Sequence, residues 1–275
     1  MHPLTLQQLF DVRGVSVLVT GAASGIGRAC AQVMALNGAR VTLADIDRGA
    51  LDAAVGELRA AGCDAVGATV DATDPTSLKN AVDAVVARCG RVDVVFANVG
   101  ISGGPGFLKG DGSRNEAAAF ETVAPELWER VLDVNVLSVV KTLQAVIPQM
   151  KRQGGGRIVV TSSISASKTE VYVGAAYVAS KAAVGQLVRQ AALELARYDI
   201  RVNAIAPGPV VTNIGGGRLK SVEARAPFER ACPMHRVGMP EDVAGAALFL
   251  ASPASRFVTG AEIVIDGGVS VGPAD

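Results

Sequence analysis

The stretch Val15–Gly27, which reads VSVLVTGAASGIG, decides the fold of this 275-residue chain. Val15–Thr20 is a short apolar run that predicts a buried strand. The glycine-rich turn after it has the pattern Gly-x-x-x-Gly-x-Gly and opens a helix expected over Gly25–Asn37. Glycines in such a turn let the backbone approach a phosphate closely, and the helix start offers free N–H groups and the positive end of its dipole. A strand, this turn and a helix together predict a dinucleotide-binding unit.

Asp45 ends the next predicted strand, Arg40–Asp45, at a position suited to the adenosine ribose of a dinucleotide. A carboxylate there accepts hydrogen bonds from both ribose hydroxyls and repels a 2′-phosphate, which favours NAD over NADP. The alternative role is a helix N-cap, because Asp45 and Asp47 both precede a predicted helix. Arg40 and Arg48 flank the position and leave some tolerance of NADP open.

Apolar strands alternate with helices along most of the remaining chain. Such alternation predicts a parallel sheet covered by helices on both faces. We therefore expect one α/β domain over residues 1–275, a doubly wound Rossmann-type fold with a sheet of about seven strands. The further strands are expected at Asp64–Val70, Val92–Ala97, Arg157–Ser162, Arg201–Ala206 and Ala261–Ile265, and the further helices at Leu51–Ala61, Thr76–Cys89, Glu126–Lys151, Ala175–Arg197 and Pro240–Ala251.

Two segments interrupt this alternation. Residues 101–124 hold five glycines between Gly103 and Gly112, and residues 212–237 contain Gly215-Gly216-Gly217 without a clear strand–helix unit. Both follow predicted strands, so they are expected at the carboxyl edge of the sheet, where such folds bind ligands. Each could be a plain surface loop. The position of the second favours a substrate lid, and the first is expected to shape the substrate entrance or a subunit contact.

Composition narrows the classes of function. Apolar residues make up 49% of the chain and charged residues 19%, which suggests that further surface is buried between subunits. Lys+Arg and Asp+Glu are both 26, so the zero net charge gives no support for nucleic acid or an anionic membrane as partner. Residues 1–11 lack a secretory h-region, and the sequence suggests no membrane span. Four scattered cysteines predict reduced thiols in a cytoplasmic protein, and His2 and His235 are too far apart to favour a metal site.

The segment Tyr177–Lys181, which reads YVASK, places a phenol and an ammonium four residues apart. On a helix such residues share a face, about 5–6 Å apart at Cβ. An ammonium at roughly 5 Å favours the phenolate by about 3 kcal/mol at an effective dielectric of about 20, which is about two pKa units. The pair could therefore exchange a proton near neutral pH, although by itself such a pair is usually a solvated helix face.

Taken together, these motifs resemble those of the short-chain dehydrogenase/reductase family, over nearly the whole chain from Val15 to Gly268. The resemblance rests on the order of the motifs as well as on their residues. The matching segments are Thr20–Gly27, Asp45, Asp71, Asn98-Val99-Gly100, Asn135, Ser163, Tyr177 with Lys181, Pro207-Gly208 with Thr212, and Asp266-Gly267-Gly268.

The resemblance implies a catalytic set of four residues. Tyr177 would be the acid/base, and Lys181 would lower the pKa of Tyr177 and bind the nicotinamide ribose. Ser163 would hydrogen-bond the substrate oxygen and stabilise its developing negative charge. Asn135 would hold a water molecule that links Lys181 to solvent.

The resemblance also implies a path of contacts along the cofactor. Asp71 would contact the adenine, Asn98 and its neighbours would line the cofactor channel, and Val210 with Thr212 would hold the carboxamide end of the nicotinamide. With NAD as cofactor and no metal, the implied cofactor-binding set is Gly21, Ser24, Gly25, Ile26, Gly27, Asp45, Ile46, Asp71, Ala72, Asn98, Val99, Gly100, Tyr177, Lys181, Pro207, Val210 and Thr212.

Three features depart from the family's usual pattern. Its Asn-Asn-Ala-Gly appears here as Ala97-Asn98-Val99-Gly100, which retains the asparagine aligned with the second position. Ser163 lies fourteen residues before Tyr177, one more than the commonest spacing, so Ser162 and Ser165 are alternatives for its role. The loop at 101–124 is longer than usual.

These implications predict an NAD-dependent oxidoreductase that interconverts a secondary alcohol and a ketone. One alternative is an NADPH-dependent carbonyl or 3-oxoacyl reductase, against which Asp45 argues; another is a non-catalytic NAD-binding regulator. Neither loop offers an obvious charged anchor, which favours a neutral, mostly apolar alcohol. Because the family often assembles through apolar helices, here near 127–147 and 182–195, we expect a homotetramer. Substrate contacts are expected from Ser102, Ser165, Tyr172, Gly208 and Pro209.

Overall fold

Seven parallel strands form one sheet in the computed structural model, which describes residues 5–272. From β1 the chain moves outward to β2 and β3 and then returns to β4 on the other side of β1, giving the order β3-β2-β1-β4-β5-β6-β7. This confirms the predicted doubly wound sheet. Residues 1–4, which include His2 and begin the N-terminal segment, lie outside the described residues. The strands are β1 (Ser16–Thr20), β2 (Arg40–Asp45), β3 (Ala65–Thr69), β4 (Val94–Ala97), β5 (Gly156–Thr161), β6 (Ile200–Pro207) and β7 (Glu262–Ile265).

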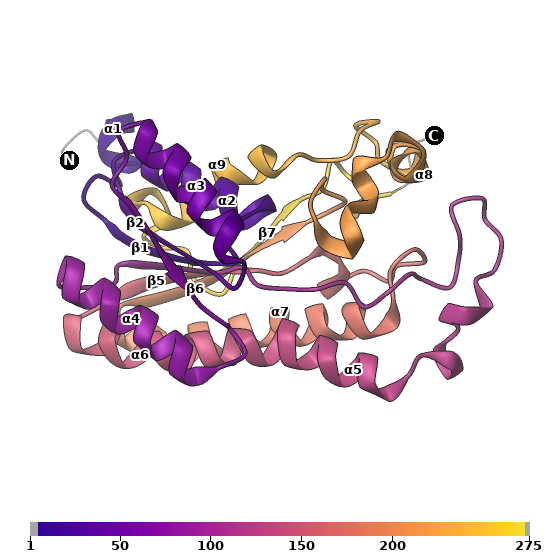
Figure 1. Cartoon of the computed structure of the whole chain (residues 1–275), viewed down its shortest axis with the longest axis horizontal. Helices are drawn as coiled ribbons and strands as arrows, with labels where there is room; N and C mark the ends of the chain where they lie inside the picture. The colour runs from indigo at the N-terminus through magenta and orange to yellow at the C-terminus, as the bar shows by residue number, and fades with distance from the viewer. Residues whose placement is uncertain (1–4, 273–275) are drawn as a thin grey trace.

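Helices cover both faces of the sheet (Figure 1). One layer packs α2, α3 and α9 over a hydrophobic cluster on one face, and the other packs α4, α6 and α7 over a second cluster. The short helix α1 and the helices α5 and α8 complete the set among the described residues. The helices are α1 (Leu6–Leu9), α2 (Gly25–Leu36), α3 (Arg48–Ala60), α4 (Pro75–Cys89), α5 (Pro125–Leu132), α6 (Ser138–Gln153), α7 (Ala175–Leu195), α8 (Val222–Ala231) and α9 (Pro240–Ala251).

Strand β1 shows why the sheet needs apolar residues on both sides. Val17, Leu18 and Val19 are all fully buried. Successive side chains of a strand point to opposite faces, so Val17 and Val19 join the cluster under α2 while Leu18 joins the cluster under α4. A strand buried on both faces has no alternation of polar residues, and this explains the continuous apolar runs in the sequence.

Local capping residues set the ends of several helices. Gly38 follows α2 with a φ of +85°, a left-handed conformation that favours glycine. Asp74 accepts from the N–H groups of Thr76 and Ser77 and so caps α4. Asp47 caps α3 by accepting from Ala50 N at 3.1 Å. The N-cap role that the sequence left open for Asp45 therefore belongs to Asp47.

Two segments contain helical detail that the sequence did not indicate. The helix expected over Glu126–Lys151 is present as one helical stretch, Pro125–Gln153, with a π-helical turn at Asp133–Leu137 between α5 and α6. Residues 212–237, which show no clear strand–helix unit in the sequence, contain a 3-10 segment at Ile214–Lys220 and the helix α8. The 3-10 segment includes Gly215, Gly216 and Gly217, whose φ values of 63°, 72° and 73° are all left-handed.

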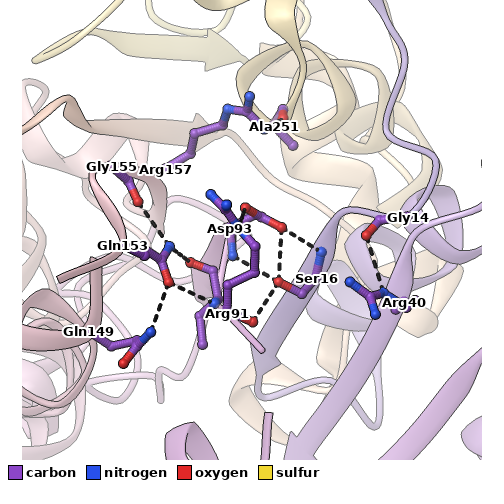
Figure 2. A network of polar contacts seen from close by, with 11 residues as sticks. Gly14, Ser16, Arg40, Arg91, Asp93, Gln149, Gln153, Gly155, Arg157 and Ala251 are labelled. Carbon is purple, nitrogen blue, oxygen red and sulfur yellow. Dashed lines mark hydrogen bonds and ion pairs between the residues drawn. The ribbon is translucent and has the colours of Figure 1, made fainter. Parts of the chain in front are cut away.

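Polar side chains close the amino edge of the sheet (Figure 2). Asp93 accepts from Ser16 N at 3.0 Å and from Arg91 Nε at 2.5 Å, and Gln153 donates to Gly155 O at 2.9 Å. Arg40 lies at this edge too, where its Nε donates to Gly14 O at 3.2 Å. Arg40 begins β2 whereas Asp45 ends it, so the expectation that Arg40 flanks Asp45 is wrong.

The helical stretch Pro125–Gln153 is long and apolar enough to cross a membrane by length and composition alone. That is weak evidence, because helices in protein cores pass the same test. Here α6 packs on α4 beside the sheet, and α5 packs on α7 (Figure 1). Part of this stretch stays exposed, including Leu132 and Leu137.

Candidate active site

A cavity of about 760 Å³ opens at the carboxyl edge of the sheet. Its walls include the residues that follow each strand from β1 to β6, so segments far apart in the sequence meet there. This is where the chain changes direction between β1 and β4, the usual ligand site of such sheets. All the expected site residues line the cavity except Gly27, Asn135 and Tyr172.

The glycine-rich turn fits a closely approaching phosphate. Gly21 and Gly25 have positive φ values, of 65° and 55°. A Cβ at Gly27 would lie 2.1 Å from Gly21 O and 2.4 Å from Asn98 Nδ2, so only glycine fits there. Gly27 thus supports the turn from behind, whereas Gly21, Gly25 and Ile26 form part of the cavity wall.

Asp45 faces the cavity with its carboxylate held by the backbone. Its Oδ2 accepts from Ala23 N at 2.9 Å and its Oδ1 accepts from Asp47 N at 3.0 Å. Each oxygen keeps a further lone pair for a ligand hydroxyl. Arg48 pairs instead with Asp52 at 3.7 Å on the surface of α3, and neither it nor Arg40 lines the cavity. The carboxylate therefore has no guanidinium beside it on the cavity wall to attract a 2′-phosphate.

Asp71 and Asn98 occupy the next part of the wall. Hydrogen bonds from the side chain and N–H of Thr73 hold the pKa of Asp71 below its ordinary value. Asn98 donates to Gly21 O at 3.2 Å and accepts from Thr161 Oγ1 at 2.8 Å. Asn98 thereby ties the glycine-rich turn and β5 to the end of β4, which fixes the position of the cavity wall.

Tyr177 and Lys181 lie on the first turns of α7 and both face the cavity. Lys181 Nζ is 5.6 Å from the centre of the Tyr177 ring and donates to Thr161 O at 2.9 Å. Lys181 is only 4% exposed, so the pair is not the solvated helix face that its sequence also allowed.

The pKa values of this pair differ from the expectation. Burial raises the pKa of Tyr177, a hydrogen bond with Ser163 opposes the rise, and the charge of Glu170 adds to it. Burial lowers the pKa of Lys181 to about 8. The charge of Lys181 by itself favours the phenolate, whereas the burial of the phenol disfavours it. Among the protein groups alone, the expected lowering of the pKa of Tyr177 is therefore wrong.

Three serines follow β5, and the structure distinguishes them. Ser163 Oγ lies 3.2 Å from Ser165 Oγ and accepts from Ser165 N at 3.2 Å. Ser162 Oγ is buried without a partner among residues 5–272. All three line the cavity, but Ser163 is the one whose hydroxyl opposes the rise in the pKa of Tyr177, which favours it for the role that the resemblance implies.

Asn135 lies behind the cavity wall, in the π-helical turn. Its Oδ1 accepts from Ile101 N at 2.7 Å, and its Nδ2 donates to Ile101 O and to Ser180 Oγ, each at 3.0 Å. π-helical turns often occur at functional sites because they redirect a side chain. Here the turn directs a fully buried amide onto the backbone beside Gly100, between the loop and α7.

Comparisons with known proteins agree with this arrangement. A family model described as enoyl-(acyl carrier protein) reductase matches residues 21–270. The L-rhamnose 1-dehydrogenase (NAD(P)(+)) of Sphingomonas sp. (strain SKA58) is 37% identical over 94% of this chain and 98% of its own length. The cyclohexanol dehydrogenase of Rhodococcus sp. (strain TK6) is 38% identical over 94% of this chain and 97% of its own length.

A solved structure of 7α-hydroxysteroid dehydrogenase complexed with NADH and 7-oxo glycochenodeoxycholic acid has a TM-score of 0.86 at 31% identity, covering 98% of this chain and 99% of that chain. The present chain belongs to the short-chain dehydrogenase/reductase family. The resemblance seen in the sequence is thereby confirmed, and the protein is an oxidoreductase.

The substrate end of this short-chain dehydrogenase/reductase carries charges that the sequence did not reveal. Arg218, in the segment 212–237, lines the cavity, so the expectation that neither loop offers a charged anchor is wrong. Glu170 and Arg130, from outside both loops, line the cavity as well. Arg218 donates to Tyr172 O at 3.1 Å and lies over the ring of Phe228, 5.4 Å from its centre. Nothing in the local sequence marked these residues, because their position depends on how the segments before and after β6 come together.

Tyr172 does not line the cavity. Its ring packs edge-on against Phe228 of α8, with the ring centres 5.4 Å apart. Tyr172 therefore holds α8 against the segment before α7, whereas Phe228, which sequence reasoning missed, forms part of the cavity wall.

The loop 101–124 is tied to the start of α7 in this short-chain dehydrogenase/reductase. Leu108 N donates to Val171 O at 3.1 Å, and Gly174 N donates to Gly104 O at 3.2 Å. A Cβ at Gly103 would lie 2.7 Å from Tyr177 N. The loop also contributes Ile101 and Ser102 to the cavity wall, so its conformation and the position of Tyr177 depend on each other.

Proposed function

We propose that this protein interconverts a secondary alcohol and the matching ketone with NAD(H), using Tyr177 as acid/base. The observation that supports it best is the meeting of Tyr177, Ser163 and Lys181 on one wall of a cavity whose far end carries the glycine-rich turn and Asp45. Relatives named for cyclohexanol and for rhamnose support a ring alcohol or a sugar as substrate.

The residues present fit a nicotinamide dinucleotide. Gly27 gives the turn the close backbone packing that a pyrophosphate site needs, and α2 begins directly at the turn. Asp45 would hold the adenosine ribose and Asp71 would meet the adenine, while Val210 and Thr212 would hold the carboxamide end. When bound, the nicotinamide accepts or donates the hydride.

The protein's own groups handle the proton and the substrate oxygen. Because burial raises the pKa of Tyr177, the phenol stays protonated at neutral pH, the form that donates a proton to a ketone oxygen. Alcohol oxidation needs the phenolate, which the charge of Lys181 favours. Ser163, which lines the same cavity, would donate to the substrate oxygen as negative charge develops on it.

Replacing Tyr177 by Phe tests this assignment. The variant keeps the ring but loses the proton, so we expect kcat/KM to fall by about 10²–10⁴-fold. The affinity for NADH, measured by its fluorescence, should stay within about twofold. Turnover is followed by NADH absorbance on a panel of alcohols and ketones. Activity close to that of the wild type would overturn the role of Tyr177, and a wild-type protein that binds NADH but turns over nothing would favour a regulator.

A further inference from the structure

Glu170 is a carboxylate in the cavity wall that the proposed reaction does not use. It lies in the segment between β5 and α7, seven residues before Tyr177. Its Oε1 is buried and has no hydrogen-bond partner among residues 5–272. A buried polar atom without a partner is costly and rare in folded proteins, so its presence in a ligand cavity calls for an explanation.

The nearest candidate cation does not satisfy Glu170. Lys168 is two residues away, but its Nζ donates to Val269 O at 2.7 Å. Burial raises the pKa of Glu170 and the charge of Lys168 only partly opposes this. The same carboxylate raises the pKa of Tyr177, so its field reaches the phenol at the reacting end of the cavity.

We propose that Glu170 accepts a hydrogen bond from a second hydroxyl group of the substrate and so selects alcohols that carry more than one hydroxyl. The proposal rests on the proposed function, because it places the reacting alcohol at Tyr177 in the same cavity. A carboxylate is an acceptor only, and a hydroxyl donor in the cavity would bind the Glu170 carboxylate through a charge-assisted bond.

The charges around Glu170 favour a neutral donor over a cation. Lys181, Arg218 and Arg130 line the same cavity as Glu170. Asp45 and Asp71 line the cavity as well, where they would hold the adenosine of the cofactor. An ammonium group on the substrate would be repelled by Lys181, Arg218 and Arg130, whereas a hydroxyl group meets no such repulsion. Arg218 is itself held by Tyr172 O and Phe228, which keeps it from pairing with Glu170.

The test compares probes that differ by one group. Cyclohexanol, 1,2-cyclohexanediol, 1,4-cyclohexanediol and 2-aminocyclohexanol are offered to the wild-type protein and to the Glu170→Leu and Glu170→Gln variants. In the wild type we expect at least one diol to exceed cyclohexanol by about tenfold or more in kcat/KM, as a hydrogen bond to a charged group allows. Glu170→Leu should abolish this preference, and Glu170→Gln, which keeps an amide oxygen, should retain part of it.

Glu241→Gln, an exposed carboxylate on α9 outside the cavity, is the matched control and should leave the preference unchanged. Binding of each probe is also measured by isothermal titration calorimetry. A diol that binds tenfold better than cyclohexanol to the wild type but not to Glu170→Leu supports the inference even if no probe is oxidised, a result that would count against the proposed function alone. Equal preference in wild type and Glu170→Leu, or a tenfold advantage for the aminoalcohol, would overturn it.

Discussion

Tyr177 and Lys181 show how burial changes a conclusion drawn from charge alone. Their spacing predicts a phenol with a lowered pKa, yet both side chains face the cavity, where the protein disfavours each charged form. Burial therefore raises the pKa of the phenol and lowers the pKa of the ammonium. For Asp45 the structure supports the prediction from charge. Asp47 caps α3, so the carboxylate of Asp45 faces the cavity instead of serving as a cap.

The lowered pKa of Lys181 predicts how stability depends on pH. Below about pH 8 the ammonium is protonated in both the folded and the unfolded chain, and its burial destabilises the fold. Between about pH 8 and the ordinary 10.5 the unfolded chain binds more protons, so the free energy of unfolding rises with pH, by about 3 kcal/mol in all. Lys181→Met lacks this gain. In urea unfolding at several pH values, the free energy of unfolding of the wild type should rise relative to that of the variant between about pH 8 and 10.5. A difference between the two free energies that does not change with pH would contradict the lowered pKa of Lys181.

Asp45→Asn tests cofactor choice at a single atom. The amide oxygen can still accept from Ala23 N, which keeps the bond to the glycine-rich turn. The amide nitrogen can no longer accept from Asp47 N, and the negative charge that repels a 2′-phosphate is gone. We expect the ratio of kcat/KM with NAD to that with NADP to fall by about tenfold or more, since a charged acceptor is lost as well. Asp47→Asn, which still caps α3, should leave the ratio as it is. An unchanged ratio in Asp45→Asn would remove Asp45 from cofactor recognition.

At the scale of elements, the base of the loop 101–124 packs backbone against backbone on the start of helix α7. Three glycines at this contact leave no room for a Cβ. An added Cβ would lie 2.7 Å from the nearest backbone atom at Gly103, and 2.1 Å from it at both Gly106 and Gly174. The loop, long as it is, therefore fits the start of α7 closely at its base. Its glycines serve this contact as well as the turns.

Gly103→Ala should displace the backbone at Tyr177 without touching the phenol. A misplacement of about 1 Å can cost two orders of magnitude in rate, so we expect kcat/KM to fall by about tenfold or more together with a lower melting temperature. Gly245→Ala, in the middle of α9 with open space around it, should leave the rate unchanged and raise stability by about 0.5–1 kcal/mol. If Gly103→Ala keeps full activity, the loop does not position Tyr177.

The sequence predicts the sheet well and the cavity only in part, for physical reasons. Apolar runs such as Val17–Val19 must be buried whatever surrounds them, so the strands follow from local pattern. Helix α8 is not predicted from the sequence because Pro227 and polar residues weaken its apolar periodicity. In the structure it is held by Phe228, which packs on Tyr172. Glu170 and Arg218 reach the cavity through contacts between distant segments, and no local pattern reveals such contacts.

For the whole molecule, the two edges of the sheet are finished differently. The amino edge is closed by the bonds of Ser16, Asp93 and Gln153 (Figure 2), whereas the carboxyl edge opens into the cavity. Large apolar side chains also remain exposed on the layer formed by α5, α6 and α7, among them Leu132, Leu137 and Leu193. We propose that copies of the chain assemble through this layer as a homotetramer.

Light scattering tests this assembly. We expect a mass of about four times the 28.0 kDa chain. Leu193 on α7 is 78% exposed, and Leu193→Asp should place a charge in the contact and lower the mass while circular dichroism stays unchanged. Leu36→Asp, an equally drastic change at an exposed leucine of α2, should keep the wild-type mass. A wild-type mass of one chain would contradict the proposal.

The three glycines 215–217 have a consequence for chirality. An L-residue in the left-handed conformation costs about 1–2 kcal/mol, and here three successive residues adopt it. For a D-residue the preference is reversed. A D-residue also has fewer conformations than glycine in the unfolded chain, so replacing a glycine here by a D-residue would favour the folded state. This short stretch, of which Gly215 and Gly216 line the cavity, thus has the backbone conformation that a chain of D-amino acids prefers. Glycine is the natural residue that adopts it without the steric cost.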